Sequence, residues 1–325
     1  MADYININGN NIPIRASDPS NPITGEVWYN LTTNALKGQG LATAAWATGT
    51  NYPLTVRDAT GFGTPTAAII MGGNDPPTIS TVNTYDGSSW ASATSLPAPN
   101  SGADSDGPQT AGLFVGGTNQ TANFGWDGST WTANPTLPVN RTGHATVGNT
   151  AVQTAALAIS GEGAPTSNTT TSDWDGSTWT AGAAIPGWAQ GTSGGGTTAA
   201  AFVNANVLDS DATSDYDGTT WSSGNNSNYG HNYGGAGGLA TNGITFGGQD
   251  VPFTARTAQA ETYDGTCWTT SASMNVARSN AHGKATVNGA TSSLCATGNS
   301  PAAPFSDATE NFTGAGPTTV TFSSS

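Results

Sequence analysis

Short runs of apolar residues that end in glycine recur along this chain and form its clearest pattern. Complete versions lie at Ala68–Gly73, Leu113–Gly117 and Ile244–Gly248, and weaker ones at 157–161, 201–204 and 294–298. A short, wholly apolar run of this kind is typical of a strand buried on both faces. Each run follows a stretch rich in Gly and Ala and precedes one rich in Thr and Ser. The pattern therefore predicts repeated sets of neighbouring strands.

A second pattern places an aromatic residue before Asp-Gly and a Trp three residues after the Gly. The five copies contain Asp86 with Trp90, Asp127 with Trp131, Asp175 with Trp179, Asp217 with Trp221 and Asp264 with Trp268. Successive aspartates are 41, 48, 42 and 47 residues apart, and a degraded sixth copy lies at Asn311–Gly314. Asp-Gly between two strands predicts a two-residue type I′ hairpin turn, in which both residues have positive φ.

A period of about 40–50 residues that carries strand signals is the mark of a β-propeller, with one blade per repeat. We therefore expect an all-β fold, a six-bladed propeller of four-stranded blades over residues 46–316. Small residues would line the axis, where six strands converge. The repeat opens with a lone outer strand around Trp46, which we expect to complete the sixth blade and close the ring. Thr318–Phe322 is the alternative closing strand; otherwise 317–325 forms a C-terminal tail.

Residues 1–45 lie outside the repeat and are too few to bury a core of their own. Two short strand-like segments, Glu26–Asn30 and Asn34–Lys37, flank Thr32-Thr33 and predict a small hairpin. We interpret this region as an N-terminal arm that lies on the propeller or on a partner.

Charge narrows the range of partners. The chain has 21 acidic and seven basic residues, a formal net charge of −14, and only 9% charged residues in total. So acidic a protein is poorly suited to bind nucleic acid or an anionic membrane surface, because both need cationic groups. No apolar run is long enough to span a membrane, and the N-terminus lacks the pattern of a signal peptide. The two cysteines, Cys267 and Cys295, are expected to be free thiols.

The Gly-Gly that ends the apolar run, the Tyr-Asp before the turn and the Trp after it together resemble the kelch repeat, from residue 46 to about 316. This variant, rich in Ala, Thr and Gly, is similar to kelch-like propellers of marine tailed bacteriophages, notably cyanophages. Gly25–Asn34 is similar to a short element near the start of phage tail and fibre proteins, and Asn311–Gly316 to their usual ending. The resemblance implies a virion structural protein and no catalytic residues.

A few side chains are candidates for binding. Arg57, Arg141 and Arg278 lie at similar positions at the start of their repeats, and they could form a cationic rim for a carboxylate or sulfate of a glycan. The alternative is that they bind backbone carbonyls. The three histidines, His144, His231 and His282, have no close ligand spacing, so we expect neither a metal nor another cofactor.

The sequence thus predicts a bacteriophage virion protein, assembled in the host cytoplasm and carried on tail, fibre or capsid in several copies. Its arm would dock to another virion protein, with Trp28 and Tyr29 as aromatic anchors. In an alternative function the ring face binds a host glycan or surface protein through Trp188, Tyr229, His231 and Tyr233. A glycan-cleaving enzyme is the third alternative, and we expect no enzymatic activity, because no paired-carboxylate arrangement stands out.

Overall fold

The computed structural model describes residues 12–163, 169–187, 190–204, 211–249, 255–280, 284–285 (backbone only) and 287–322. The chain divides into a small unit, Met1–Ala44 with Gly314–Ser325, and a larger unit, Ala45–Thr313. Regular structure in the described parts is β throughout, apart from one 3₁₀ turn at Asn149–Ala151. No helix in these parts is long and apolar enough to cross a membrane.

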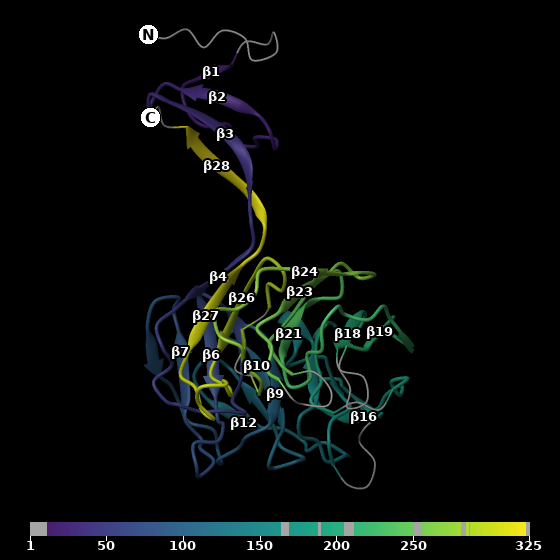
Figure 1. Cartoon of the computed structure of the whole chain (residues 1–325). Helices are drawn as coiled ribbons and strands as arrows, with labels where there is room; N and C mark the ends of the chain where they lie inside the picture. Colours follow the sequence, from purple (N-terminus) through teal and green to yellow (C-terminus); the bar gives the residue numbers. More distant parts are fainter. Residues whose placement is uncertain are drawn as a thin grey trace. The chain divides into compact units, whose positions relative to one another are not determined.

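Six of the seven four-stranded sheets in the described residues belong to the larger unit (Figure 1). In each of them the strands pair antiparallel in the order first, second, third and fourth. The sheets are β5 (Thr60–Thr64), β6 (Ala67–Met71), β7 (Val82–Tyr85) and β8 (Trp90–Ser92); β9 (Ala103–Asp106), β10 (Gly112–Gly116), β11 (Asn123–Trp126) and β12 (Trp131–Ala133); β13 (Ala145–Val147), β14 (Ala156–Ile159), β15 (Thr171–Trp174) and β16 (Trp179–Ala181); β17 (Ser193–Gly196), β18 (Ala201–Asn204), β19 (Thr213–Tyr216) and β20 (Trp221–Ser223); β21 (Gly235–Leu239), β22 (Asn242–Phe246), β23 (Ala260–Tyr263) and β24 (Trp268–Thr270); and β25 (Lys284–Ala285), β26 (Ser292–Ala296), β27 (Thr309–Thr313) and β4 (Ala45–Thr48).

The first strands of successive sheets lie next to one another. β5 contacts β9, β9 contacts β13, β13 contacts β17, β17 contacts β21, β21 contacts β25, and β25 contacts β5. These strands approach so closely that glycine is required: a Cβ added to Gly195 in β17 would lie 2.6 Å from the carbonyl carbon of Gly237 in β21. Repeated four-stranded sheets arranged in this way form a β-propeller-like fold.

The second strand of each sheet is apolar because both of its faces are buried. In β6, Ile69 packs with Phe114 of the following sheet, whereas Ile70 packs with Leu294 of β26. Full burial of one such side chain is worth about 1.5–3 kcal/mol. The core of the larger unit therefore consists of layers between neighbouring sheets, which is why the apolar runs of the sequence show no alternation.

One backbone hydrogen bond recurs in all six sheets and relates the fourth strand to the third. A Trp is the first or second residue of each fourth strand. The residue six positions after this Trp is buried, and its amide donates to a carbonyl that precedes the third strand, at 2.7–3.1 Å. The donor–acceptor pairs are Tyr52–Asp307, Leu96–Ser80, Leu137–Thr121, Ile185–Thr169, Ser227–Asp211 and Met274–Ala258. β4, which begins the larger unit, therefore has the same relation to β27 as the other fourth strands have to their neighbours.

The Asp-Gly turns differ from the expected type I′ geometry. Tyr85 pairs with Trp90, so the loop has four residues, and among Asp86 and Gly87 only the glycine has positive φ, at 96°. The Asp86 carboxylate instead accepts hydrogen bonds from the amides of Ser88 and Ser89, at 2.8 and 2.7 Å. The same amide bonds occur at Asp127, Asp175, Asp217 and Asp264. The aspartate caps the loop with its side chain, as in an Asx turn.

The seventh sheet contains both ends of the described chain (Figure 1). Its order is β1 (Ile14–Arg15), β2 (Val27–Asn30), β3 (Ala35–Ala42) and β28 (Gly316–Phe322), with β1 parallel to β2 and the other pairs antiparallel. The expectation of a free tail at 317–325 is therefore wrong for Pro317–Phe322. The alternative in which Thr318–Phe322 completes the last sheet of the propeller is also wrong, because β27 pairs with β4, with Trp46 opposite Phe312.

Candidate functional site

Six residues that precede the first strands of the larger unit share a left-handed backbone. They are Asp58, Gly102, Gly143, Gly191, Tyr233 and Asn280, with φ between 52° and 66°. Because glycine adopts this conformation freely and other residues rarely do, the three positions that carry a side chain are unusual. We call these six residues the inner ring.

Backbone hydrogen bonds connect five successive members of the inner ring, from Asp58 to Tyr233. The amides of Gly102, Gly143, Gly191 and Tyr233 donate to the carbonyls of Asp58, Gly102, Gly143 and Gly191, at 3.0, 2.9, 2.9 and 2.8 Å. The Asn280 side-chain amide donates to the Asp58 carboxylate at 2.5 Å. Side chains at this ring therefore start from a fixed backbone, which is what a precise binding site needs.

Tyr233 extends from the ring to two other sheets. Its hydroxyl donates to Glu162 at 3.2 Å and accepts a hydrogen bond from Gln190 at 3.0 Å, while Gln190 also donates to Glu162. Burial, together with the charge of Glu162, raises the pKa of Tyr233 to about 12. The phenol therefore remains a hydrogen-bond donor at neutral pH, beside one carboxylate and one amide.

Arg57 is half-exposed and directly precedes Asp58 of the inner ring. Its guanidinium carbon lies 5.3 Å from the ring centroid of Phe305, and its Nε lies 3.4 Å from the Asp58 carboxylate. Arg57 forms an isolated β-bridge, and Thr142 and Ser279 form the equivalent bridges in their own repeats. It therefore occupies the position after that of Arg141 and Arg278, and the expectation that the three arginines are equivalent is wrong.

Arg141, His231 and Arg278 are equivalent to one another, but all three are fully buried. Each contacts the backbone carbonyl of the residue that directly follows the second strand, a residue with positive φ. The carbonyls are those of Ser160, Gly247 and Thr297, at 2.5, 2.7 and 3.2 Å. The expectation that these three side chains form an exposed rim is corrected by this burial. Arg141 and Arg278 bind backbone carbonyls, the alternative that the sequence left open for the arginines.

The third strand supplies each of these side chains with a second partner. Arg278 donates to Glu310 at 2.6 Å, Arg141 to the hydroxyl of Ser172 at 3.0 Å, and His231 contacts Glu261 at 3.1 Å. Sequence reasoning missed the two glutamates. A signal was present, because each lies two residues before the aromatic that precedes the turn, in a repeat that begins with a basic residue.

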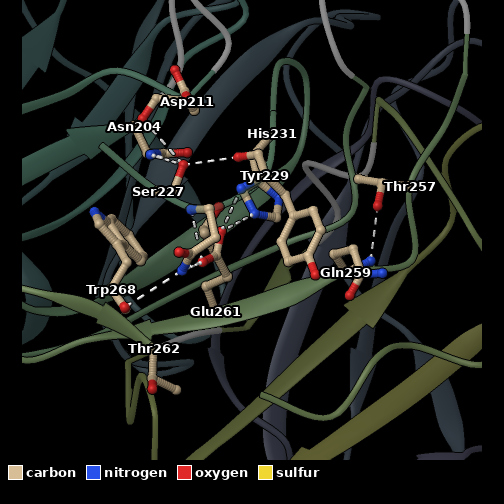
Figure 2. A network of polar contacts seen from close by, with 12 residues as sticks. Asn204, Asp211, Ser227, Tyr229, His231, Thr257, Gln259, Glu261, Thr262 and Trp268 are labelled. Atoms are coloured by element: carbon tan, nitrogen blue, oxygen red, sulfur yellow. Dashed lines mark hydrogen bonds and ion pairs between the residues drawn. The ribbon is translucent and has the colours of Figure 1, made fainter. Parts of the chain in front are cut away.

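Figure 2 shows the network around Glu261, which is fully buried. The carboxylate accepts hydrogen bonds from the amides of Asn228 and Tyr229 at 2.9 and 3.1 Å, in addition to its contact with His231. Burial alone would raise the pKa of Glu261, but the bonds from His231 and Asn228 hold this pKa below its usual value. The two ring nitrogens of His231 lie 2.7 Å from the Gly247 carbonyl and 3.1 Å from the Glu261 carboxylate, and these two contacts hold the loop before β21 in place.

A surface hollow of about 480 Å³ lies beside the segment that leads into β13. Its lining has no charged residue and combines one aromatic ring with hydroxyl and amide groups: Thr118, Asn119, Gln120, Thr121, Ala122, Phe124 and Asn140. None of the rim residues expected from the sequence lines this hollow. Of those, Tyr229 is 39% exposed, and Trp188 lies outside the described residues.

The expected docking residues of the N-terminal arm differ in exposure. Trp28 is completely buried, and its indole donates to Asp18 at 2.9 Å. The adjacent Tyr29 is partly exposed on the opposite face of β2. Trp28 is therefore a core residue of the small unit, which corrects its expected role as an exposed anchor.

The described residues contain no group of three or more His, Cys, Asp or Glu side chains that could hold a metal ion. His144 lies within this part of the chain and contacts the Thr146 hydroxyl at 3.2 Å, whereas His282 lies outside it. Cys295 is buried and Cys267 is exposed, and both are free thiols.

Comparison with known proteins supports the fold. No family model and no curated protein matches the sequence. Of 264 solved chains that match, one is described as "Structure of YjhT"; it has a TM-score of 0.66 and 13% sequence identity, and the match covers 83% of this chain and 99% of that one. A similarity at this identity shows the fold alone, because one fold serves many functions.

Proposed function

We propose that this chain is a bacteriophage virion structural protein that displays a kelch-like propeller on tail, fibre or capsid and has no catalytic role. The observation that carries this proposal is the place of the two phage-like segments. Gly25–Asn34 contains β2, and Asn311–Gly316 connects β27 to β28, so both belong to or lead into the small unit. Both ends of the chain thus belong to one unit and the repeats to the other. This division suits a protein in which the larger unit is displayed and the small unit attaches it.

The displayed module in this proposal is a closed ring of six blades, with β4 as the outer strand of the last blade. The interactions of Thr50 support this closure. Trp90 donates its indole to the Thr50 carbonyl, and Thr50 donates its hydroxyl to Ser88, at 2.9 and 2.6 Å. Trp131 and Thr94 repeat this pattern one sheet later, at 2.9 and 2.7 Å for the equivalent bonds. The residues after β4 thus contact the first blade as a preceding blade would.

The test is the protein composition of purified particles. Mass spectrometry of washed virions from the phage that encodes this chain should detect its peptides. A version reduced to residues 45–313 should be absent from particles, whereas a full-length chain with Arg57→Ala should be incorporated normally. Absence of the wild-type chain from washed particles would reject a structural role in the virion.

Glycan recognition is a second candidate function, favoured by the uncharged hollow at Phe124. An aromatic face flanked by amide and hydroxyl groups is suited to a neutral sugar, which offers an apolar ring face and many hydroxyls. On an array of host surface glycans, binding by the wild-type protein should be lost in Phe124→Ala and Asn119→Ala. The outward-facing variant Thr132→Ala is the control, and equal binding by all four proteins would exclude this hollow.

A further inference from the structure

Among the described residues, the sheet of the small unit is covered on one face. On the covered face, Asp18 accepts hydrogen bonds from Trp28, Asn30 and Lys37, at 2.9, 2.6 and 2.7 Å. The segment that follows β1 therefore lies over this face and buries Trp28 completely. The opposite face has no comparable cover among the described residues.

The uncovered face carries apolar side chains from all four strands. The pairing of Ile14 with Tyr29, of Tyr29 with Leu36 and of Leu36 with Phe322 places these side chains in one row. Val27 and Val320, both paired with Gly38, form a second row. Ile14, Val320 and Phe322 are 68%, 43% and 49% exposed. We call these six side chains, Ile14, Val27, Tyr29, Leu36, Val320 and Phe322, the apolar face.

Two glycines of β3 lie beneath side chains of β28. A Cβ on Gly38 would lie 2.9 Å from the ring of Phe322, and one on Gly40 would lie 3.4 Å from Val320. The side chains of β28 therefore lie over the glycines of β3, which is a known way to stabilise glycine in a sheet. An apolar sheet face is the kind of surface that packs against a second sheet.

Charge is distributed very unevenly between the two units. Three of the 21 acidic and two of the seven basic residues belong to the small unit, which leaves it at −1 and the larger unit at −13. Both basic residues of the small unit are paired, Arg15 with Glu26 and Lys37 with Asp18. Like charge opposes contact between two copies through the larger unit, whereas the apolar face carries no ionisable group except the phenol of Tyr29.

We propose that the apolar face is a contact surface for a second copy of this chain, in which the two faces pack against each other about a two-fold axis. The same patch then serves both copies, and it contains none of the residues that give each larger unit its charge of −13. Strands about 4.8 Å apart give a face of about 15 by 20 Å, so two faces bury well under 1,200 Å². The association is therefore weak and reversible for isolated molecules.

The test uses the full-length chain in sedimentation velocity between about 10 µM and about 1 mM, a range that covers weak interfaces. We expect concentration-dependent dimers, and at least a tenfold increase in the dissociation constant for Val320→Thr with Phe322→Thr. The matched control is Thr319→Val with Thr321→Val on the opposite face of the same strand, which should dimerise like the wild type. Ile14→Thr, on the other edge of the face, should weaken dimers without altering β28.

Three results would overturn the proposal. The first is a wild-type chain that is monomeric over the whole concentration range. Dimerisation only after removal of residues 1–11 counts as the same result, because the apolar face would then be covered within the chain. The second is undiminished dimerisation of both Val320→Thr/Phe322→Thr and Ile14→Thr, which would indicate pairing at the edge of β28. The third is an equal loss in the control. Hydrogen exchange of the β3 amides checks that each variant retains the sheet. None of these results depends on a virion, so they leave the proposed function untouched.

Discussion

At the scale of single residues, the larger unit is held by a few buried polar pairs that repeat from sheet to sheet. A basic side chain before the first strand binds the carbonyl near the end of the second strand, and it has a partner on the third. Arg278 with Glu310 is the strongest example, because Glu310 also accepts hydrogen bonds from the amides of Asn275 and Val276, at 2.6 and 3.3 Å. Such a pair joins three strands and the incoming loop through two side chains.

Removal of one partner of this pair should be costly. Glu310→Ala leaves the Arg278 guanidinium buried without its carboxylate, and we expect the free energy of unfolding to fall by about 3–5 kcal/mol. Denaturant unfolding measures the loss. Glu26→Ala is the control, because its pair with Arg15 is partly exposed (side chains 21% and 42%) and should cost under about 1 kcal/mol. Equal losses in the two variants would contradict the structural role of the buried pair.

The two thiols should differ sharply in reactivity. Burial raises the pKa of Cys295 to about 11, whereas Cys267 is exposed in the fifth Asp-Gly turn. The thiolate is the reactive form, so a thiol reagent at pH 8 should modify one cysteine per native chain and two after denaturation. In Cys267→Ser the native chain should not react. Rapid modification of Cys295 in the native protein would show that β26 is open to solvent.

At the scale of elements, the capped turns explain why Asp-Gly is repeated so faithfully. Each carboxylate satisfies two backbone amides of its own loop, and the following glycine has positive φ. These hydrogen bonds hold the pKa of Asp86, Asp127, Asp175, Asp217 and Asp264 below the usual value. A depressed pKa in the folded state means that ionisation of the turn stabilises the fold.

The pH dependence of stability follows from this sign. The stabilisation is complete above the pKa of the aspartates in the unfolded chain, about 3.9. It is lost as the pH falls through their lower pKa values in the folded protein. We expect a nearly constant Tm from pH 7 to pH 5 and a marked fall below about pH 4. Asp173 and Asp215 oppose this trend, because burial raises their pKa. Replacement of the five turn aspartates by Asn should reduce the fall of Tm below about pH 4. An unchanged fall of Tm would show that other groups control it.

The sequence predicted the elements of the larger unit better than its side-chain interactions. Periodicity identifies the apolar second strands and the Trp that begins five of the fourth strands, because these depend on burial and on local turn chemistry. The sequence left open whether the arginines form a rim or bind backbone carbonyls, since periodicity cannot show whether Arg141 points into a sheet or out of it. The pairing of β3 with β28 joins residues nearly 280 positions apart, and no local pattern in Pro317–Phe322 indicates its partner.

At the level of the whole molecule, we propose a closed ring of six blades in which β4 is the last outer strand. The claim explains why Tyr52, six residues after Trp46, bonds to Asp307 as its equivalents bond in the other sheets. It also gives the chain a seam at which its beginning and its end are held together. In such a ring the sheet of the last blade takes strands from both ends of the larger unit, as the pairing of β4 with β27 requires.

An engineered disulfide between β4 and β27 measures whether these two strands pair in solution. Ala47 and Asn311 are opposite each other in the β4–β27 pair, at a separation that suits a disulfide. In a Cys267→Ser background, Ala47→Cys with Asn311→Cys should form an intramolecular disulfide on mild oxidation, detectable by mass spectrometry. Ala47→Cys with Thr319→Cys should not form one, because Thr319 pairs with Gln39. A disulfide between positions 47 and 319, and none between 47 and 311, would contradict closure of the ring by β4.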